Sequence, residues 1–505
     1  MNRRTFLLQT LAALSTALPT SAAVTPAPPE FAEVRRFIQQ GILQERAPSV
    51  AVAVVKHDKL IWAEGFGFAD LEAHRPATAE SIYLLASVSK PITATGLMVL
   101  ADRGLIELDK PANAYLPGSK LQAARGSAEE ITVRRLANHT SGLQVHYNFY
   151  YDNVPPLSHD EVIRRYGIAH TLPGSRIEYC NLAFGILDYI TEVVAQAPWR
   201  KFMEESVYDP IGMSHTSDRV RPELEPKATV QYQPDLAGKF IREPPYQFDH
   251  NGASAIWSSA TDLSRFLRLH LNKGAVDGRR LLKEETARSM TVVSAIRNPE
   301  NSNAGFGVAW AVGSTLGHRT FEHSGGMPGV ATWIRGFPDD HAGFVVLINA
   351  SGTDLMAKTC EGLTRALFPN AREELARPAP KRPVDTKPDR FVGEWKGALS
   401  HFEGDISMTL SVSPDGTARA KLGKREAIPL RDVSFANSTM KGQMRGQLTA
   451  QPGYHGPVTL EYALEVIEEE IIGIGVAKAE GYFALSHGVR LARQRGKSEG
   501  EREAR

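Results

Sequence analysis

The chain has few cysteines and no excess of one charge, and both properties exclude certain classes of protein. Only Cys180 and Cys360 occur among 505 residues, too few for a disulfide framework. We expect two buried free thiols, because cysteine packs like a small apolar side chain. Lysine and arginine (58) nearly balance aspartate and glutamate (57), which argues against a nucleic-acid partner or a charged membrane surface. The expected partner is a small-molecule or peptide substrate.

The chain also lacks long apolar runs and metal-binding motifs. The apolar run that ends at Leu18 is shorter than the ~20 residues that span a bilayer, and no later run reaches that length. The 15 histidines are scattered and His-Glu-x-x-His does not occur, so no metal site is indicated. The sequence therefore predicts no stable membrane span after signal cleavage and no metal or other cofactor. It gives no indication of the oligomeric state.

The N-terminus has the pattern of an export signal. Arg3 and Arg4 precede the apolar run, and the small residues Ser21 and Ala23 follow it. This order predicts a signal peptide at residues 1–23. The Arg-Arg-x-Phe-Leu pattern resembles a twin-arginine signal, with an ordinary secretory signal or a short membrane anchor as the alternatives. We expect a periplasmic or secreted protein.

Residues 31–368 read as one α+β domain. Strand patterns come first, helical patterns follow, and strands return before a closing helix, which predicts an antiparallel sheet flanked by helices together with a helical region. The early hairpin is expected to pair with the late strands. Pro91 is tolerated only in a first helical turn, which places Ser87 near a helix N-terminus. The expected strands lie at 49–55, 60–67, 305–312, 331–336 and 343–349, and the expected helices include 87–104, 182–194 and 261–271.

The C-terminal part has a different composition. Residues 370–388 are rich in proline and charge, as in a linker. Within 389–493, apolar and polar residues alternate, for example from Val458 to Val466, which predicts a small antiparallel β-barrel of the lipocalin-like kind. Residues 494–505 are highly charged and are expected to be a disordered tail. A Gly-x-Ser-x-Gly pattern in that tail has no strand before it, so an α/β-hydrolase is disfavoured.

Ser87 and Lys90 are candidates for a nucleophile and its base. Three residues apart on a helix, their side chains share a face. A serine hydroxyl needs a neighbouring base to attack a carbonyl, and an amine in a desolvated cleft can lose its proton near neutral pH. The alternative is a serine at a helix start followed by a solvated lysine.

Tyr179 and Asn181 are candidates for proton transfer and positioning. With its pKa lowered by Lys90, Tyr179 could carry the serine proton to the leaving group. Asn181 could hold Lys90 or a substrate amide, because its side chain both donates and accepts hydrogen bonds. A half-buried tyrosine beside a turn-forming asparagine is the alternative.

The segment from His323 to Gly326 is a candidate substrate-binding strand. His323 could hydrogen-bond a substrate carboxylate or carbonyl, and Gly325 and Gly326 permit close backbone approach. The backbone amides of Ser87 and Gly326 would then form an oxyanion hole. A strand histidine followed by a glycine bulge is the alternative.

Together, Ser87-Val88-Ser89-Lys90, Tyr179-Cys180-Asn181 and His323-Ser324-Gly325 resemble the three active-site motifs of the class C β-lactamase and D-alanyl-D-alanine carboxypeptidase superfamily, which includes esterases. His139-Thr140-Ser141-Gly142-Leu143 and Pro210-Ile211-Gly212-Met213 also resemble it. The likeness covers about residues 31–368. It implies a β-lactamase/transpeptidase-like domain, acylation of Ser87, Lys90 and Tyr179 as the acid/base pair, and hydrolysis by water. The barrel resembles accessory domains of some esterases and D-aminopeptidases.

One departure from the family pattern concerns the substrate. Class C β-lactamases carry lysine where this chain has His323, and a histidine is mostly uncharged at neutral pH. We expect weaker recognition of carboxylates, with activity on such substrates falling as the pH rises through the pKa of His323. The sequence thus predicts an exported serine hydrolase of an ester, amide or D-amino-acid peptide bond. A β-lactamase, or a catalytically silent penicillin-binding or sensor protein, is the alternative.

Overall fold

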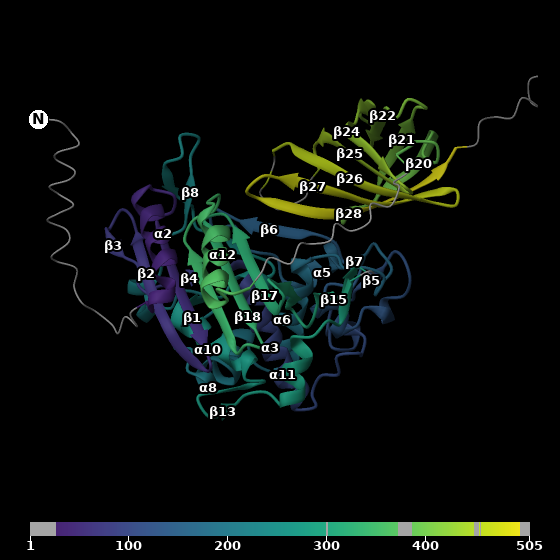
Figure 1. The fold of residues 1–505 in the computed structure, drawn as a ribbon. Coiled ribbons are helices and arrows are strands. Elements are labelled where there is room, and N and C mark those ends of the chain that lie inside the picture. Colours follow the sequence, from purple (N-terminus) through teal and green to yellow (C-terminus); the bar gives the residue numbers. More distant parts are fainter. Residues whose placement is uncertain (1–26, 299–300, 372–385, 449–453, 455, 495–505) are drawn as a thin grey trace, which may run out of the picture.

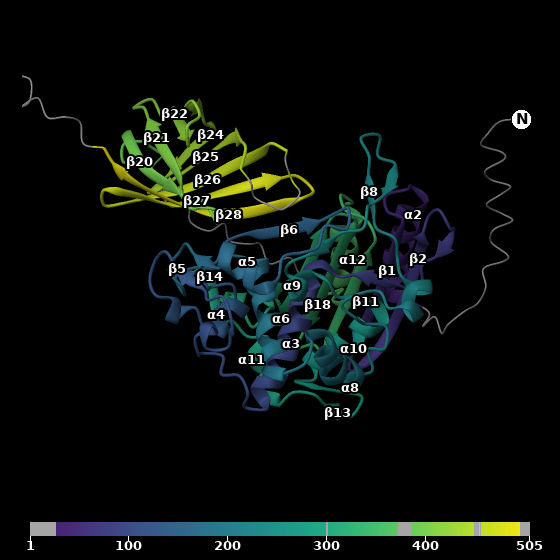
Figure 2. The same cartoon turned by 180° about the vertical axis from the view of Figure 1, so that it is seen from behind.

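The computed structural model describes residues 27–298, 301–371, 386–448, 454 and 456–494. These residues form an α+β unit followed by a nearly closed, barrel-shaped antiparallel sheet, which confirms the predicted fold class (Figures 1 and 2). The predicted signal peptide, most of the predicted linker and almost all of the predicted tail lie outside the described residues. Where the structure describes the chain, no helix is long and apolar enough to cross a membrane.

The sheet of the α+β unit joins the two ends of that unit. Among the described residues, nine strands run in the order β14-β15-β16-β17-β18-β19-β1-β2-β3. Strand β1 pairs antiparallel with β19, for example Val52 opposite Val346, so the early hairpin and the late strands share one sheet. The strands are β1 (Ser49–Lys56), β2 (Lys59–Asp70), β3 (Arg75–Pro76), β14 (Ala295–Asn298), β15 (Asn301–Phe306), β16 (Ala311–Thr315), β17 (His318–Met327), β18 (Val330–Phe337) and β19 (Ala342–Ile348).

The prediction of one strand across 305–312 is wrong. Strand β15 ends at Phe306 and β16 begins at Ala311. Between them the Gly307 N–H donates to the Trp310 carbonyl at 2.8 Å, and Ala309 has a positive φ of 65°. The intervening apolar residues are buried in a turn, so their hydrophobicity does not mark a strand here.

Helices cover both faces of this sheet. Alternate residues of β1 enter different apolar clusters, with Val50 and Val52 on one face and Ala51 and Ala53 on the other. Helices α2 (Ala32–Leu43) and α12 (Leu355–Leu367) pack on the first face, and α10 (Ala260–Leu271) packs on the second (Figure 1). Such burial on both faces accounts for the continuous apolar sequence of β1.

The helical region surrounds one central helix. Helix α3 (Ser89–Asp102) follows a 3₁₀ turn, η2 (Ala86–Val88), and packs against α6 (Asn181–Ala195) and α9 (Asn251–Ser254). All residues of α3 from Ser89 to Leu100 are buried. The other helices are α4 (Val133–Ala137), α5 (His159–Tyr166), α7 (Trp199–Met203), α8 (Asp209–Ile211) and α11 (Glu284–Met290). The short strands are β4 (Ile82–Leu84), β5 (Gln122–Ala123), β7 (Ile168–Ala169), β8 (Tyr232–Pro234), β9 (Phe240–Arg242), β11 (Trp257–Ser259), β12 (Ala275–Val276) and β13 (Arg279–Arg280).

The barrel strands run in the order β23-β22-β21-β20-β28-β27-β26-β25-β24. Burial alternates strictly along β26, and the buried residues include Val458 and Leu460, so each second side chain enters the barrel core. The strands are β20 (Gly393–Leu399), β21 (Ile406–Val412), β22 (Ala418–Leu422), β23 (Ile428–Pro429), β24 (Arg431–Ala436), β25 (Thr439–Gly446), β26 (Val458–Ile467), β27 (Glu470–Ala479) and β28 (Phe483–Arg493).

One strand of the α+β unit joins the barrel sheet. Strand β6 (His146–Tyr150) pairs with β28, with Tyr147 opposite Ala484, and with β10 (Gln247–Phe248) through Phe149. Both views show β6 lying along β28 (Figures 1 and 2). The two units are therefore connected by backbone hydrogen bonds as well as by the chain itself.

Candidate active site

Ser87 and Lys90 meet at the start of helix α3. Ser87 lies in η2, and its Oγ is 3.0 Å from Lys90 Nζ. Lys90 is fully buried, and its Nζ also donates to Asn181 Oδ1 at 2.7 Å and to the Ala253 carbonyl at 3.1 Å. The structure thus brings three sequence-predicted residues together and adds Ala253. Sequence reasoning missed Ala253, because a backbone carbonyl carries no signal in the side-chain pattern.

The environment of Lys90 favours its neutral form. Burial lowers the pKa of Lys90 well below its ordinary value, and within the described residues no carboxylate forms an ion pair with it. A neutral amine has two N–H bonds and one lone pair. Asn181 Oδ1 and the Ala253 carbonyl accept the two N–H bonds. The lone pair then remains for the Ser87 hydroxyl.

Tyr179 faces the same pair of residues but is not a ready base. Its ring centroid lies 4.8 Å from Lys90 Nζ. Burial raises the pKa of Tyr179, and a hydrogen bond with Ser87 only partly opposes this shift. The expectation that Lys90 lowers this pKa is therefore wrong, because desolvation of the phenol outweighs any effect of the buried amine. Tyr179 is a neutral phenol, suited to donate a proton.

His139 holds the ring of Tyr179. Their ring centroids are 4.4 Å apart at an angle of 31°, and His139 Nδ1 accepts the Cys180 N–H at 3.3 Å. Burial lowers the pKa of His139 well below its ordinary value, so it is a neutral packing partner. The sequence pointed to this histidine only through family likeness and assigned it no role. Cys180, like Cys360, is buried and free.

His323 is neutral and already uses one ring nitrogen. Its Nδ1 lies 2.7 Å from the Ser324 carbonyl, so Nδ1 carries the proton and donates to that carbonyl. Burial, with a further contribution from Lys90, lowers the pKa of His323 to about 3. The fall in activity on carboxylates that the sequence predicts as the pH rises through this pKa stays a prediction, and the lowered pKa places it well below neutral pH. His323 adds no positive charge to the site at neutral pH.

Gly325 and Gly326 have different surroundings. A Cβ on Gly325 would lie 2.2 Å from Thr332 Oγ1 and 2.4 Å from the Leu85 carbonyl. This close approach packs β17 against the segment that carries Ser87. A Cβ on Gly326 would meet nothing within 4 Å, because Gly326 faces the cavity that Ser87 also lines.

The residue before the nucleophile is strained. Ala86 has a φ of 49°, in the left-handed region that L side chains rarely adopt. Thr332 Oγ1 donates to the Leu85 carbonyl at 2.7 Å and holds this turn against β18. Such strained positions cluster at functional sites, and this one directly precedes Ser87.

These groups surround a cavity of about 370 Å³. Tyr147 of β6 contributes to its wall, and Arg297 and Glu322 bring charge to it. The sequence concentrates aromatic residues around Tyr147, a pattern that fits a pocket wall as well as the packing of a surface loop. The other lining residues are Ser87, Tyr179, Phe306, Ala311, His323, Ser324, Gly326 and Trp333.

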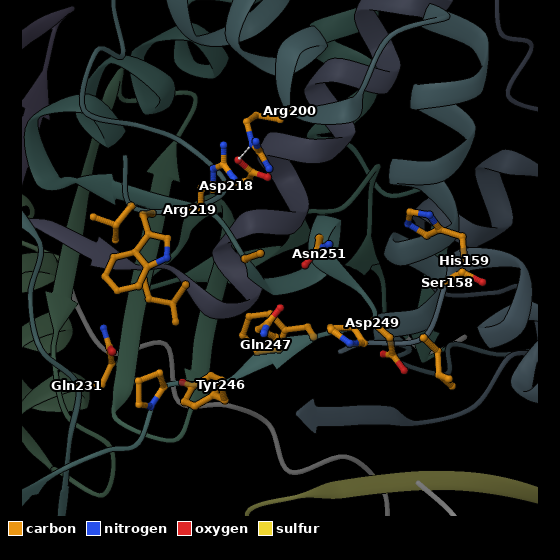
Figure 3. A pocket seen from close by; sticks show the side chains of 18 residues that line it. Ser158, His159, Arg200, Asp218, Arg219, Gln231, Tyr246, Gln247, Asp249 and Asn251 are labelled. Atoms are coloured by element: carbon orange, nitrogen blue, oxygen red, sulfur yellow. Dashed lines mark hydrogen bonds and ion pairs between the residues drawn. The ribbon is translucent and has the colours of Figure 1, made fainter. Parts of the chain in front are cut away.

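A second cavity of about 550 Å³ lies elsewhere in the same unit (Figure 3). Tyr246 lies in one part of it and His159 in another, and Trp257 is also among the lining residues. Ser158, the serine found among its lining residues, accepts the Glu161 N–H at 3.3 Å as the cap of α5. Among the described residues no base contacts this hydroxyl, and His159 pairs with Asp188, so the chemistry points to the smaller cavity.

One buried cluster contains metal-ligating residue types. Potential ligand atoms of His146, Asp249 and His250 all lie within 4.8 Å of one another. Both imidazoles, however, lie within hydrogen-bond distance of the same carboxylate oxygen, Asp249 Oδ1, at 2.9 and 2.8 Å. The cluster is complete as a hydrogen-bonded group, and sequence reasoning did not find it.

A family model described as Beta-lactamase matches residues 34–366. The chain belongs to the beta-lactamase family. Among curated relatives, Protein Rv1367c of Mycobacterium tuberculosis is 27% identical over 287 residues, covering 51% of this chain and 70% of that protein. Residues 34–366, which the family model matches, include Ser87, Lys90, Tyr179 and His323.

Solved structures of related fold extend the likeness. A structure described as the octameric penicillin-binding protein homologue from Pyrococcus abyssi has a TM-score of 0.59 at 22% identity, covering 90% of this chain and 99% of that one. A D-stereospecific amidohydrolase from Streptomyces has a TM-score of 0.54 at 21% identity, covering 66% of this chain and 98% of that one. At these identities the likeness shows the fold alone, a β-lactamase/transpeptidase-like fold.

Proposed function

We propose that this beta-lactamase family protein hydrolyses its substrate through an acyl-enzyme on Ser87. The observation that carries the proposal is the 3.0 Å approach of Lys90 Nζ to Ser87 Oγ, with Asn181 Oδ1 and the Ala253 carbonyl as the other two oxygen atoms around the amine. The lone pair of Lys90 removes the hydroxyl proton as Oγ attacks the substrate carbonyl carbon. The carbonyl oxygen becomes an oxyanion, which the backbone amides of Ser87 and Gly326 stabilise.

Tyr179 completes the acylation step. As the bond to the leaving group breaks, the neutral phenol donates its proton to the leaving oxygen or nitrogen and regains one from Lys90. Water then attacks the acyl-enzyme carbonyl, releases the acid and restores Ser87. In this scheme Lys90 is the base and Tyr179 is the acid, in agreement with the opposite directions of their pKa shifts.

The character of the cavity favours an ester, an amide or a D-amino-acid peptide bond as substrate. His323 is neutral, and the charges that Arg297 and Glu322 bring to the cavity are of opposite sign. This balance supports uncharged small-molecule or peptide substrates over anionic β-lactams. The likeness to a D-stereospecific amidohydrolase is in keeping with this choice. We also propose export to the periplasm or beyond the cell, on the basis of Arg3, Arg4 and the apolar run that follows them.

Active-site labelling tests this function. The purified protein is treated with a fluorescent fluorophosphonate, and the labelled residue is located by mass spectrometry of peptides. Ser87→Ala should abolish labelling, whereas Ser158→Ala, at the larger cavity, should leave it unchanged. Turnover of a p-nitrophenyl ester, a D-alanyl amide and a chromogenic cephalosporin then ranks the substrate classes. A folded protein whose label is absent, or survives in Ser87→Ala, would refute the proposal.

A further inference from the structure

Asp249 is a buried carboxylate that does not line the cavity of the proposed site. The side chain of Asp249 is fully buried, and four donors contact it. His146 Nε2 and His250 Nδ1 donate to Oδ1 at 2.9 and 2.8 Å. Asn148 Nδ2 and the Tyr150 hydroxyl donate to Oδ2 at 2.5 and 3.1 Å.

Asp249 is held in its charged form. Burial alone would raise the pKa of Asp249, but the charge and hydrogen bonds of His146 and His250 keep it below the ordinary value. A buried carboxylate with every oxygen paired rigidifies the groups that donate to it. Its donors come from strand β6 and from the residue before helix α9, so Asp249 ties these two segments together.

The first connection to Lys90 runs through β6. The backbone carbonyl of His146 accepts Asn181 Nδ2 at 2.8 Å. This bond fixes which way the Asn181 amide faces, because its nitrogen must point toward β6. Asn181 Oδ1 is then directed to Lys90 Nζ, 2.7 Å away.

The second connection runs through α9. His250 is the residue before this helix, and its carbonyl accepts the Ala253 N–H at 3.0 Å. Ala253 in turn presents its own carbonyl to Lys90 Nζ at 3.1 Å. A shift of His250 would therefore move the second acceptor of the amine.

We propose that Asp249 is a positioning residue for Lys90, an inference that rests on the function proposed above. By fixing β6 and α9 relative to each other, Asp249 places both acceptors of the amine so that its lone pair points to Ser87. Asp249 does not touch the substrate, because it lines the larger cavity and not the one that holds Ser87 (Figure 3). Its effect is expected on the rate of acylation and not on substrate binding.

The test compares two buried aspartates. Asp249→Asn removes the charge and replaces one carboxylate oxygen with an amide NH₂ group. This group cannot accept a hydrogen bond, so at least one of the four donors loses its acceptor. Asp262→Asn is the matched control, since Asp262 is buried and accepts the His215 N–H and the Thr216 hydroxyl at 2.7 and 2.8 Å, without a contact to Lys90. The rate constant at which Ser87 Oγ attacks the phosphorus of the fluorophosphonate probe and displaces fluoride is measured by stopped flow, separately from the dissociation constant of the probe. This rate constant serves as the measure of Ser87 acylation below. Circular dichroism confirms that each variant is folded.

We expect Asp249→Asn to slow acylation by 10-fold or more, while the dissociation constant of the probe changes by less than 2-fold. Tyr150→Phe, which removes one donor and leaves the carboxylate in place, should slow acylation by 2- to 3-fold and serves if Asp249→Asn does not fold. Asp262→Asn should acylate at the wild-type rate. An unchanged rate in folded Asp249→Asn or Tyr150→Phe, or an equal loss in Asp262→Asn, would overturn the inference.

Two further outcomes are decisive. Metal analysis of the purified protein should find no stoichiometric metal. A metal that is lost in Asp249→Asn, and whose removal by a chelator slows acylation, would replace the positioning role with a metal site. If the wild-type protein is not labelled at Ser87, the proposed function itself fails and this inference fails with it. Labelling of the wild type with no effect of Asp249→Asn would refute the positioning role alone.

Discussion

Helix α3 of the α+β unit and strand β26 of the barrel are buried in different ways. Helix α3 is surrounded on all sides, and it carries polar side chains into the interior. Lys90 and Thr93 each find acceptors there, including the carbonyls of Ala253 and Gly252. Strand β26 buries only each second residue, as at Leu460 and Leu464. Buried polar groups need hydrogen-bond partners, so the polar side chains of α3 are held in fixed positions. Buried side chains of β26 such as Leu460 and Leu464 are apolar and contribute to packing alone.

This difference predicts that substitutions in α3 change the rate of the reaction and that substitutions in the barrel change the stability of the fold.

The largest effect is expected for Lys90→Met, which keeps the length of the side chain and removes the base. Loss of a general base costs about 10²- to 10⁴-fold in rate, so acylation of Ser87 should fall within that range. Stopped-flow labelling measures it, with the exposed Lys358→Met as control. Acylation within 5-fold of the wild type would contradict the role of Lys90.

The next effect concerns Tyr179→Phe, which removes the proposed proton donor without changing the ring. A poor leaving group depends on protonation more than a good one does, so hydrolysis of an alkyl amide should fall by about 10²-fold. Hydrolysis of a p-nitrophenyl ester should fall much less. Comparison of kcat for the two substrates checks this. Equal losses would mean that Tyr179 acts by packing and not by proton transfer.

A smaller effect is expected for His323→Lys. Hydrogen bonds to charged groups contribute about 1.5–3 kcal/mol, so the added cation should raise kcat/KM for carboxylate-bearing substrates by about 10-fold or more.

In the wild type, the ratio of activities on anionic and neutral substrates should not reflect titration of His323 between pH 5 and 8. The pKa of His323 is lowered to about 3, so the imidazole stays neutral throughout that range. A step in this ratio that disappears in His323→Asn would contradict the neutral imidazole.

The smallest effect on the reaction is expected where the two units meet. A Cβ on Gly488 of β28 would lie 2.6 Å from the ring of His170, so Gly488→Val should push the barrel from β6. Overpacking of this kind costs about 1–3 kcal/mol of stability, and acylation should fall only a few-fold through the shift of β6. Gly313→Val is the matched control, since open space surrounds Gly313. Thermal unfolding and labelling rates measured together separate the two effects.

The sequence predicted the side chains to which the proposed reaction is assigned. Ser87, Lys90, Tyr179 and His323 stand in short motifs, and the fold brings Ser87, Tyr179 and His323 to one cavity with Lys90 buried against Ser87. The alternation of residues such as Val458 and Leu460 likewise predicted the barrel. Both kinds of pattern are local, so they can be read without knowing which distant segments meet.

Other parts of the site depend on contacts between distant segments. Ala253 acts through its backbone, so no residue type marks it. Asp249 gains its role only when β6, about a hundred residues earlier, folds over it. The neutrality of His323 comes from the depth of its burial, which a motif does not encode. Pairing of β6 with β28 joins segments more than 330 residues apart, beyond any local periodicity.

The shared strand β6 limits how the barrel can be exchanged for another accessory module. Its hydrogen bonds to β28 satisfy one edge of β6, and the other edge has only the two-residue strand β10. A replacement module would have to offer a new strand to Tyr147 and Asn148. Otherwise it would leave an aromatic edge open to self-association. The barrel thus supports, through β28, the strand that carries Tyr147 into the wall of the Ser87 cavity, and any replacement module would have to provide the same support.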